Sequence, residues 1–472
     1  MSKHRSLINN TFLYAIGPFL NSVLSVILIP YYSFHFTTAE LGYYDLIVTS
    51  GSIVIAISTL KISDALYRWL IDSEQNINKK ISAVSNSFFI IIVSFVLLIF
   101  GFWLFGKNIQ YPQLVCTYIL STILLTHFQQ LLRGSGYLKI YSWLAFINCF
   151  LIIVFNFLFL GYLHYKLKGV MLAIIFANII SIACIVLKVD LFKFIKFNAV
   201  NKLPIKEMIS YTSPLVFNAI NLWFLGGFDR YVIVTYLGLN YSGIYAVAIK
   251  FSSILLLLNS FFILAWQDFI LVNKNVRGFQ FNFNNFFNKY VVLQFSIAVF
   301  FIAISKFVFL FFIDIKFIDA WKYLPILLLG FSFQGFTSFL GTLFLIEKNT
   351  KMMFKTTLAG GVVNIAVSLI LVSYIALYAP AVGLLAGFMV TFLIRYLLLK
   401  NKMELKLNKP HVILMCMFFI VITAMVNSAS KILMVISILS SIIVIFLANK
   451  KLWMQLFDYF LNLINFKKTT KV

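Results

Sequence analysis

Four ionisable residues in the second half of the chain lie inside stretches that are otherwise apolar: Asp229, Arg230, Lys250 and Lys306. An ionisable side chain at membrane depth costs at least about 2.5 to 3.5 kcal/mol on insertion scales, so it usually marks a functional site. A rise of about 1.5 Å per residue puts Asp229, Lys250 and Lys306 at a similar depth of roughly 10 Å from the outer end of their stretches. Three positive charges against one negative charge in this layer suit an anionic ligand. We therefore predict that Arg230, Lys250 and Lys306 bind substrate, with Lys250 as a partner for Asp229.

A second interpretation exists for the two lysines. A Lys stem spans several ångströms, so Lys250 and Lys306 can also snorkel to the outer headgroups. Arg230 fits that alternative less well, because its neighbours Gly226, Gly227 and Asp229 are unusual in a stretch that faces lipid.

No other part of the sequence offers a familiar catalytic, metal or cofactor site. No GxxxxGKS or GxxxxGKT phosphate loop is present, so ATP hydrolysis by this chain is not expected. The four cysteines lie inside apolar runs, with no pair at a metal-ligand or redox spacing: Cys116, Cys149, Cys184 and Cys416. We expect no cofactor, no metal and no enzyme activity.

The composition is typical of a membrane protein. Hydrophobic residues make up 62% of the 472 residues and charged residues only 11%, whereas soluble domains are about 45 to 50% apolar and about 25% charged. The net charge of +24 comes from 38 Lys and Arg against 14 Asp and Glu. Such an excess suits nucleic acid or an anionic membrane face. Because the basic residues stand between apolar runs, we predict a membrane and no nucleic acid.

Fourteen transmembrane helices are predicted, because about 20 apolar residues cross a hydrocarbon core of about 30 Å. No signal peptide is expected, since the first apolar run, Leu7 to Ser33, exceeds the length of a signal-peptide core. The fold class is therefore all-α and polytopic. The approximate spans are 9–33, 41–60, 83–105, 112–132, 141–163, 168–187, 209–236, 243–272, 288–313, 323–346, 356–377, 380–400, 411–427 and 432–449.

The basic residues predict that both termini are cytoplasmic. With the N-terminus inside, cytoplasmic segments hold 28 of the 38 Lys and Arg, outer loops hold six and the spans hold four. Basic residues near span ends are retained on the cytoplasmic side. Apolar residues at spacings of three and four then predict an amphipathic helix on the cytoplasmic leaflet: Trp453, Leu456, Phe457, Phe460, Leu463 and Ile464.

Features of the first six spans recur in the next six. Gly17-Pro18 lies early in the first span and Ser213-Pro214 early in the seventh, while Gly169 and Gly383 open the sixth and the twelfth. Parallel repeats of this kind are found in transporters, where the site lies between two halves that rock against each other.

The repeat and a polar linker over 188–207 divide the chain into three parts. We predict an N-terminal six-helix bundle over 1–200 and a C-terminal six-helix bundle over 201–405. An extra helix pair and the amphipathic tail follow over 406–472.

Three short motifs accompany this organisation: Leu7-Ile8-Asn9-Asn10, Thr38-Ala39-Glu40-Leu41-Gly42-Tyr43-Tyr44 and Phe228-Asp229-Arg230-Tyr231. Together with two six-span halves and a terminal pair, they resemble the polysaccharide-exporter branch of the multidrug, oligosaccharidyl-lipid and polysaccharide (MOP) transporter superfamily, in particular Wzx-type O-antigen flippases. The resemblance implies a flippase of the bacterial plasma membrane, acting in polysaccharide or lipopolysaccharide biosynthesis. Its substrate would be an undecaprenyl-diphosphate-linked oligosaccharide, moved from the inner to the outer leaflet.

This resemblance gives the intramembrane charges specific roles. Arg230, Lys250 and Lys306 would line a cationic cavity that holds the diphosphate while the lipid tail stays outside. Antiport of H⁺ or Na⁺ would need a titratable carboxylate within the membrane, and Asp229 is the best placed for ion coupling. Implied partners are membrane lipids, H⁺ or Na⁺, and the polymerase and chain-length proteins of the same pathway.

The remaining polar residues of the spans receive structural roles. Arg395 lies close to a cytoplasmic span end and is predicted to reach the interface. A set of polar residues in the first half offers candidates for lining a sugar path, but we favour hydrogen bonds between helices: His127, Gln129, Gln130, Asn21, Asn148, Asn156 and Asn178.

Two rival functions stay open. A drug or small-cation exporter of the same superfamily would share the fold, but a pocket for organic cations should be net acidic. A polytopic glycosyltransferase or polysaccharide polymerase should carry a large outer loop or carboxylates for sugar chemistry. The outer loops are short, and the charge is basic, so the flippase is preferred.

Overall fold

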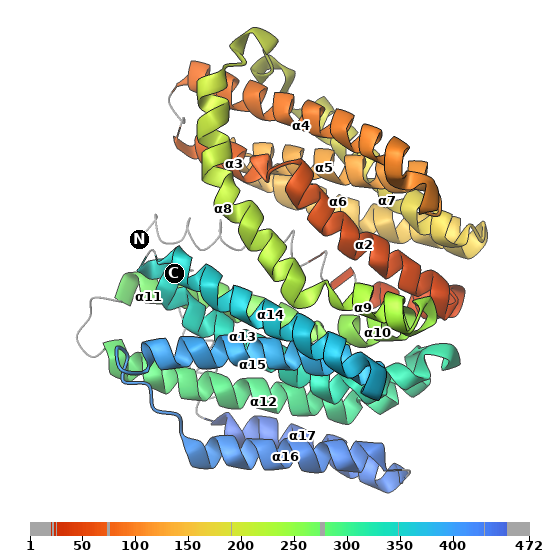
Figure 1. Cartoon of the computed structure of the whole chain (residues 1–472), viewed down its shortest axis with the longest axis vertical. Coiled ribbons are helices and arrows are strands. Elements are labelled where there is room, and N and C mark those ends of the chain that lie inside the picture. Colours follow the sequence, from red (N-terminus) through yellow and green to blue (C-terminus); the bar gives the residue numbers. More distant parts are fainter. Residues whose placement is uncertain are drawn as a thin grey trace, which may run out of the picture. The chain divides into compact units, whose positions relative to one another are not determined.

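The structure is a computed structural model that describes residues 20, 23–24, 26–72, 76–189, 191–273, 279–347, 349–428 and 430–450. These residues form helices joined by short turns, and no strand occurs among them (Figure 1). Twelve helical segments within the described residues are long and apolar enough to cross a membrane. The predicted all-α polytopic membrane fold is confirmed.

The twelve segments coincide with the predicted spans 2 to 6 and 8 to 14. Most of the predicted first span and the whole amphipathic tail lie outside the described residues. The predicted seventh span is broken into α8 (Lys202–Gly226) and α9 (Asp229–Tyr236). The short helix α3 (Ile62–Asp72) was not predicted, and it buries Ile62, Ala65, Leu66 and Leu70 along one face.

The chain divides into two compact units, with the boundary between Trp223 and Phe224 inside α8. In the first unit, α7 packs against α6 and α5, and α5 also packs against α3 and α4. The three-part division at residues 200 and 405 stays a prediction. Besides α3 and most of α8, the helices of this unit are α2 (Thr38–Ser58), α4 (Ile77–Phe105), α5 (Pro112–Gly134), α6 (Leu138–Asn156) and α7 (Lys166–Lys188).

In the second unit, α15 packs against α14 and α13, while α9 contacts α14 and α10. The helix pair α16 and α17 lies along α12, as the blue and green helices of Figure 1 show. Besides α9, the helices are α10 (Leu239–Ser252), α11 (Ile254–Asn273), α12 (Phe279–Phe312), α13 (Leu324–Ile346), α14 (Thr350–Ile375), α15 (Tyr378–Lys400), α16 (Lys409–Asn427) and α17 (Lys431–Ala448).

Three helices of each unit pack against one another in the same way. In the first unit, α5 and α6, the helices of spans 4 and 5, pack against α7, the helix of span 6. In the second unit, α13 and α14, the helices of spans 10 and 11, pack against α15, the helix of span 12. A sequence repeat would produce this correspondence, so it supports the proposed repeat.

Close packing of these helices depends on glycine. A Cβ atom on Gly169 would lie 2.9 Å from the carbonyl oxygen of Phe159, and one on Gly383 would lie 2.8 Å from that of Asn364. Likewise, a Cβ atom on Gly387 would lie 2.6 Å from the carbonyl oxygen of Gly360. Membrane helices use small residues to approach closely, since apolar side chains gain little by leaving lipid tails. Glycine thus sets the spacing of α14 and α15.

We expect Gly383→Ala to lower the thermal stability of the purified protein in detergent. The added methyl group must displace the backbone of α14, and overpacking of this kind typically costs about 1 to 3 kcal/mol. Gly101→Ala in α4 is the matched control, because a Cβ atom there meets nothing within 4 Å. A melting temperature of Gly383→Ala equal to or above that of the control would contradict the packing role.

Candidate functional site

The break between α8 and α9 places backbone carbonyls without helical partners among the apolar helices of the second unit. The α8 helix ends at Gly226 and α9 begins at Asp229. Unsatisfied backbone groups are costly inside a bilayer, so such breaks persist only where protein groups satisfy them. Here the Nδ2 group of Asn364 donates to the carbonyl of Leu225 (2.9 Å), and Nη1 of Arg230 donates to that of Gly226 (2.6 Å). Side chains from two helices therefore stabilise the broken end of α8.

Asp229 is fully buried and is held by neutral donors from two further helices. Its Oδ1 accepts a hydrogen bond from Nδ2 of Asn364 in α14 (3.1 Å), and its Oδ2 accepts one from the hydroxyl of Tyr245 in α10 (3.2 Å). The carboxylate also lies in the first turn of α9, where the helix dipole favours a negative charge. Asp229 therefore joins α9, α10 and α14.

Arg230 is 6% exposed and shares a neighbour with Asp229. Its guanidinium carbon lies 5.7 Å from the centroid of the Tyr245 ring, within the range of a cation–π contact. The hydroxyl of the same Tyr245 donates to Asp229. One aromatic side chain thus contacts both charges of the Asp229 and Arg230 pair.

Asn364 is the central hydrogen-bonding residue of the cluster. Its amide nitrogen donates to Leu225 and Asp229, and its Oδ1 accepts from the hydroxyl of Ser368 (3.2 Å). Gly383 of α15 contacts Asn364 directly, as described above. We define the Asp229 cluster as Asp229, Arg230, Tyr245, Asn364 and Ser368.

Only part of the predicted site lies in this cluster. Lys306 of α12 donates through Nζ to the carbonyls of Val426 (3.1 Å) and Ser428 (2.9 Å), and lies 5.1 Å from the centroid of the Trp321 ring. It therefore caps the last turn of α16. Lys250 lies near the C-terminal end of α10 and is half-buried. Substrate binding by Arg230, Lys250 and Lys306, and the pairing of Lys250 with Asp229, stay predictions.

Arg395 corrects one expectation. The sequence predicts that it reaches the interface, but its side chain is buried in the second unit with only 4% exposed. Its guanidinium donates to the carbonyl of Thr337 (2.7 Å) and to the hydroxyls of Thr356 (3.0 Å) and Thr357 (2.9 Å). Position near a span end was misleading, because these acceptors lie on neighbouring helices. Arg395 cross-links α13, α14 and α15.

The hydrogen-bonding interpretation is confirmed for His127, Asn148, Asn156 and Asn178, whereas the buried Oε1 atom of Gln130 has no hydrogen-bond partner among the described residues and Asn21 lies outside them. His127 is fully buried between the hydroxyls of Ser63 (3.0 Å) and Ser87 (3.3 Å). Asn148 donates to Asn178 (3.2 Å). Asn156 similarly accepts from the hydroxyl of Tyr32 (3.1 Å).

Three functional candidates were missed from the sequence. Asn364 carries the signal of a lone amide in an apolar span, whereas Tyr245 carries no comparable signal, because aromatic residues are frequent throughout this chain. Asp45 in α2 is a second buried carboxylate, with 3% of its surface exposed. Among the described residues, no group of three or more His, Cys, Asp and Glu is arranged to hold a metal ion.

Solved structures identify the fold. The lipid II flippase MurJ, in an inward closed conformation, matches with a TM-score of 0.71 at 17% identity over 94% of this chain and 100% of that one. A MATE family transporter of the MOP superfamily in its inward-facing conformation matches with a TM-score of 0.68 at 13% identity over 82% and 94% of the two chains. The chain has the fold of the MOP superfamily.

Other comparisons add one more structural match and no family assignment by sequence. A MATE transporter of Vibrio cholerae, crystallised as a mutant, shares the MOP fold with a TM-score of 0.57 at 12% identity, over 86% of this chain and 98% of that one. No protein-family model and no curated protein sequence matches the chain. The sequence resemblance to the MOP superfamily is therefore supported through the fold.

We expect Asn364→Leu to destabilise the protein, because the substitution keeps the side-chain size but leaves the Leu225 carbonyl and Asp229 without one donor each. A buried group that loses its partner costs about 1 to 3 kcal/mol. Thermal unfolding in detergent measures the effect. Tyr245→Phe, which removes a single hydroxyl, should have a smaller effect, and an Asn364→Leu protein that melts like wild type would contradict the analysis.

Proposed function

We propose that this chain is a flippase that moves an undecaprenyl-diphosphate-linked oligosaccharide, an O-antigen unit or a similar polysaccharide unit, from the inner to the outer leaflet of a bacterial plasma membrane. It does so by alternating access, with both termini in the cytoplasm. The observation that carries the proposal is the Asp229 cluster, in which a buried arginine and a buried carboxylate lie next to a break in a membrane helix.

Arg230 suits a phosphate-bearing ligand. A guanidinium is planar, stays protonated and presents five N–H donors that match phosphate oxygens in pairs. The net charge of +24 also favours an anionic cargo over a cationic one. Lys250 and Lys306 remain proposed contributors, although the two hydrogen bonds of Lys306 to the end of α16 restrict its position.

The extent of the structural match also favours a lipid cargo. The match to MurJ leaves out about 6% of this chain, fewer residues than the stretch 406–472 contains. It therefore extends into the C-terminal helices, whereas the match to the MATE transporter covers 82% of the chain. MurJ is a lipid II flippase. The fold of this chain therefore matches the whole length of a protein that moves a lipid.

A drug exporter is the second candidate, and two observations favour it. The MATE transporters share the fold, and the described helices contain two buried carboxylates, Asp45 and Asp229, whose negative charge suits an organic cation. The two functions are separated in a deletion strain by measuring on which leaflet the lipid-linked oligosaccharide accumulates and how susceptible the strain is to drugs. A polymerase or glycosyltransferase is distinguished by the same experiment.

Deleting the gene should cause the lipid-linked oligosaccharide to accumulate on the cytoplasmic leaflet, and the wild-type chain should relieve the accumulation. We expect Arg230→Gln to fail in this rescue, lowering export roughly tenfold or more, since one lost charged contact of about 1.4 kcal/mol accounts for a factor of ten. Arg68→Gln is the control, because its ion pair with Asp72 is exposed and contributes little.

Three results would contradict the flippase proposal. Accumulation on the outer leaflet would favour a polymerase. Altered drug susceptibility without any lipid accumulation would favour a drug exporter. Normal rescue by a well-expressed Arg230→Gln protein would remove the cationic site.

We further propose that Asp229 couples transport to H⁺ or Na⁺. Both ions bind carboxylate oxygens, and both oxygens of Asp229 are held in place, Oδ1 by the Nδ2 group of Asn364 and Oδ2 by the hydroxyl of Tyr245. Binding of either ion compensates the negative charge beside Arg230. The arginine would then attract an anionic headgroup more strongly, so that ion and cargo bind together.

Collapsing the H⁺ or Na⁺ gradient in membrane vesicles should slow export by the wild-type chain, and Asp229→Asn should abolish that response. The reason is that an amide of equal size neither takes up a proton nor supplies a charge for Na⁺. Initial export rates with each gradient present and absent give the measurement. Asp72→Asn, at an exposed carboxylate, should respond like wild type, and an unchanged gradient response of Asp229→Asn would exclude this role.

A further inference from the structure

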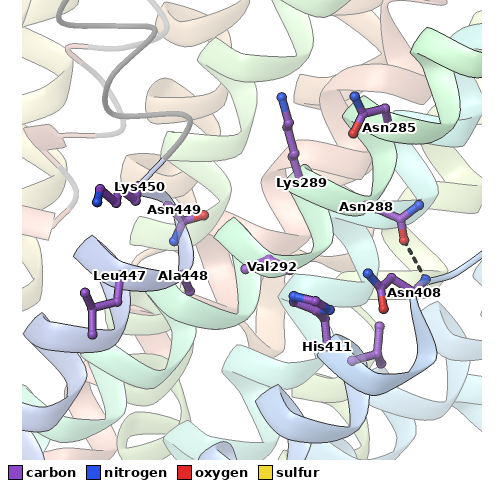
Figure 2. Close-up of a pocket in the computed structure, with 11 residues that line it drawn as sticks. Asn285, Asn288, Lys289, Val292, Asn408, His411, Leu447, Ala448, Asn449 and Lys450 are labelled. Atoms are coloured by element: carbon purple, nitrogen blue, oxygen red, sulfur yellow. Dashed lines mark hydrogen bonds between the residues drawn. The ribbon is translucent and has the colours of Figure 1, made fainter.

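A second polar site lies at the start of the C-terminal helix pair, away from the Asp229 cluster in sequence. It is a pocket of about 440 Å³ within the second unit, formed where α12, the start of α16 and the end of α17 meet. Figure 2 shows residues of α17 on one side and of α16 on the other, with Lys289 and Val292 of α12 between them. A volume of this size accommodates a small organic ligand.

The pocket walls are fixed by hydrogen bonds. Asn288 of α12 accepts from the backbone N–H of Asn408 (2.8 Å) and donates to the carbonyl of Lys406 (2.8 Å), as the dashed line in Figure 2 marks for the first contact. Asn449 at the end of α17 donates to the hydroxyl of Ser296 in α12 (3.2 Å). These bonds attach the start of α16 and the end of α17 to α12, so the pocket is formed before a ligand binds.

The polar side of the pocket is basic. Lys289 and Lys450 line it together with His411 and the amides of Asn285 and Asn288, and no Asp or Glu is among its eleven lining residues. The α16 helix begins there and α17 ends there, so their backbone dipoles oppose each other. The two ammonium groups therefore determine the sign of the site, which favours an anion with hydrogen-bond acceptors.

The other side of the pocket is apolar and continues along the helix pair. Leu447 lines the pocket and is 69% exposed, and its neighbour Phe446 is exposed as well. Ile413 and Leu414, in the first turns of α16, are also exposed. A ligand that carries an anionic head and a hydrocarbon chain uses both sides, whereas a soluble anion uses only the basic one.

We propose that this pocket binds the phosphate headgroup of an anionic phospholipid, whose acyl chains lie against the exposed apolar side chains of α16 and α17. Basic pockets between membrane helices on the cytoplasmic side are suited to such headgroups. The distribution of lysines predicts that this end of α12, α16 and α17 faces the cytoplasm. The lipid is a resident of the inner leaflet and not the transported substrate, so the assignment does not rest on the proposed function.

Native mass spectrometry of the delipidated full-length protein tests this assignment. Wild type should retain phosphatidylglycerol at least fivefold better than phosphatidylcholine with the same acyl chains. Lys289→Gln combined with Lys450→Gln should remove that preference. The control is Lys351→Gln combined with Lys355→Gln, two exposed lysines of α14 that do not line the pocket, and it should keep the preference.

Further arms separate charge from folding. The Lys289→Arg and Lys450→Arg double variant keeps both charges, so it should retain the preference if the pocket is a charge-dependent lipid site. Equal phosphatidylglycerol retention by the Gln double variant and the control would overturn the assignment. The assignment is supported if the Gln double variant loses the lipid and the Arg double variant retains the lipid, whatever the melting temperatures of the two variants.

Competition experiments distinguish a phospholipid headgroup from inorganic phosphate and from the transported lipid as the ligand of the pocket. Inorganic phosphate in large excess should leave phosphatidylglycerol bound, because it cannot use the apolar side of the pocket. Displacement by inorganic phosphate would identify a soluble-anion site and overturn the lipid assignment. Preferential displacement by equimolar undecaprenyl diphosphate would assign the pocket to the transported lipid, and would overturn it as well.

Discussion

The structure depends on one constraint: a backbone polar group inside the hydrocarbon region must find its partner within the protein. Unbroken helices satisfy this constraint without help, so a break in a helix has to be stabilised by side chains. At Gly226 that stabilisation comes from Asn364 and Arg230, which donate to the carbonyls at the end of α8. The same two side chains lie beside Asp229. The residues that satisfy the backbone carbonyls at the helix break are therefore also the residues that form the charged cluster.

Two other cations of the second unit, the buried Arg395 and the half-buried Lys306, also donate to backbone groups, but they have a different role. Arg395 and Lys306 both donate to backbone carbonyls, Arg395 between α13, α14 and α15 and Lys306 at the end of α16. A buried cation surrounded by such acceptors is compensated without a carboxylate, and it fixes helices in place. Arg230 differs because a carboxylate, Asp229, adjoins it in sequence and shares Tyr245 with it.

Hydropathy was sufficient to predict twelve of the spans, because a helix that faces lipid must be apolar over about 20 residues whatever its neighbours are. The break at Gly226 and the helix α3 were not predicted, since both are specified by contacts between helices. The cluster was half predictable for the same reason. Asp229 and Arg230 stand out as charges in an apolar stretch, whereas Asn364 is more than 130 residues away along the chain and only folding brings it to Asp229. The depth of a residue in the membrane can be estimated by counting residues from the end of its span, but this count did not predict the partners of Lys306 and Arg395. The carbonyls that a cation reaches depend on which helices lie beside it.

The charge balance of the cluster bears on how transport would be coupled. A permanent excess of positive charge buried among apolar helices is costly, and it would hold a diphosphate too tightly to release it on the far side. A neighbouring arginine and carboxylate have no net charge together, so they are less costly to bury and attract an anion weakly. Ion binding at Asp229 would make the pair cationic when cargo is to be bound, and ion release would restore the balance when cargo is to leave. On the proposed function, reversible neutralisation of Asp229 would therefore allow a cationic site both to bind its cargo and to release it.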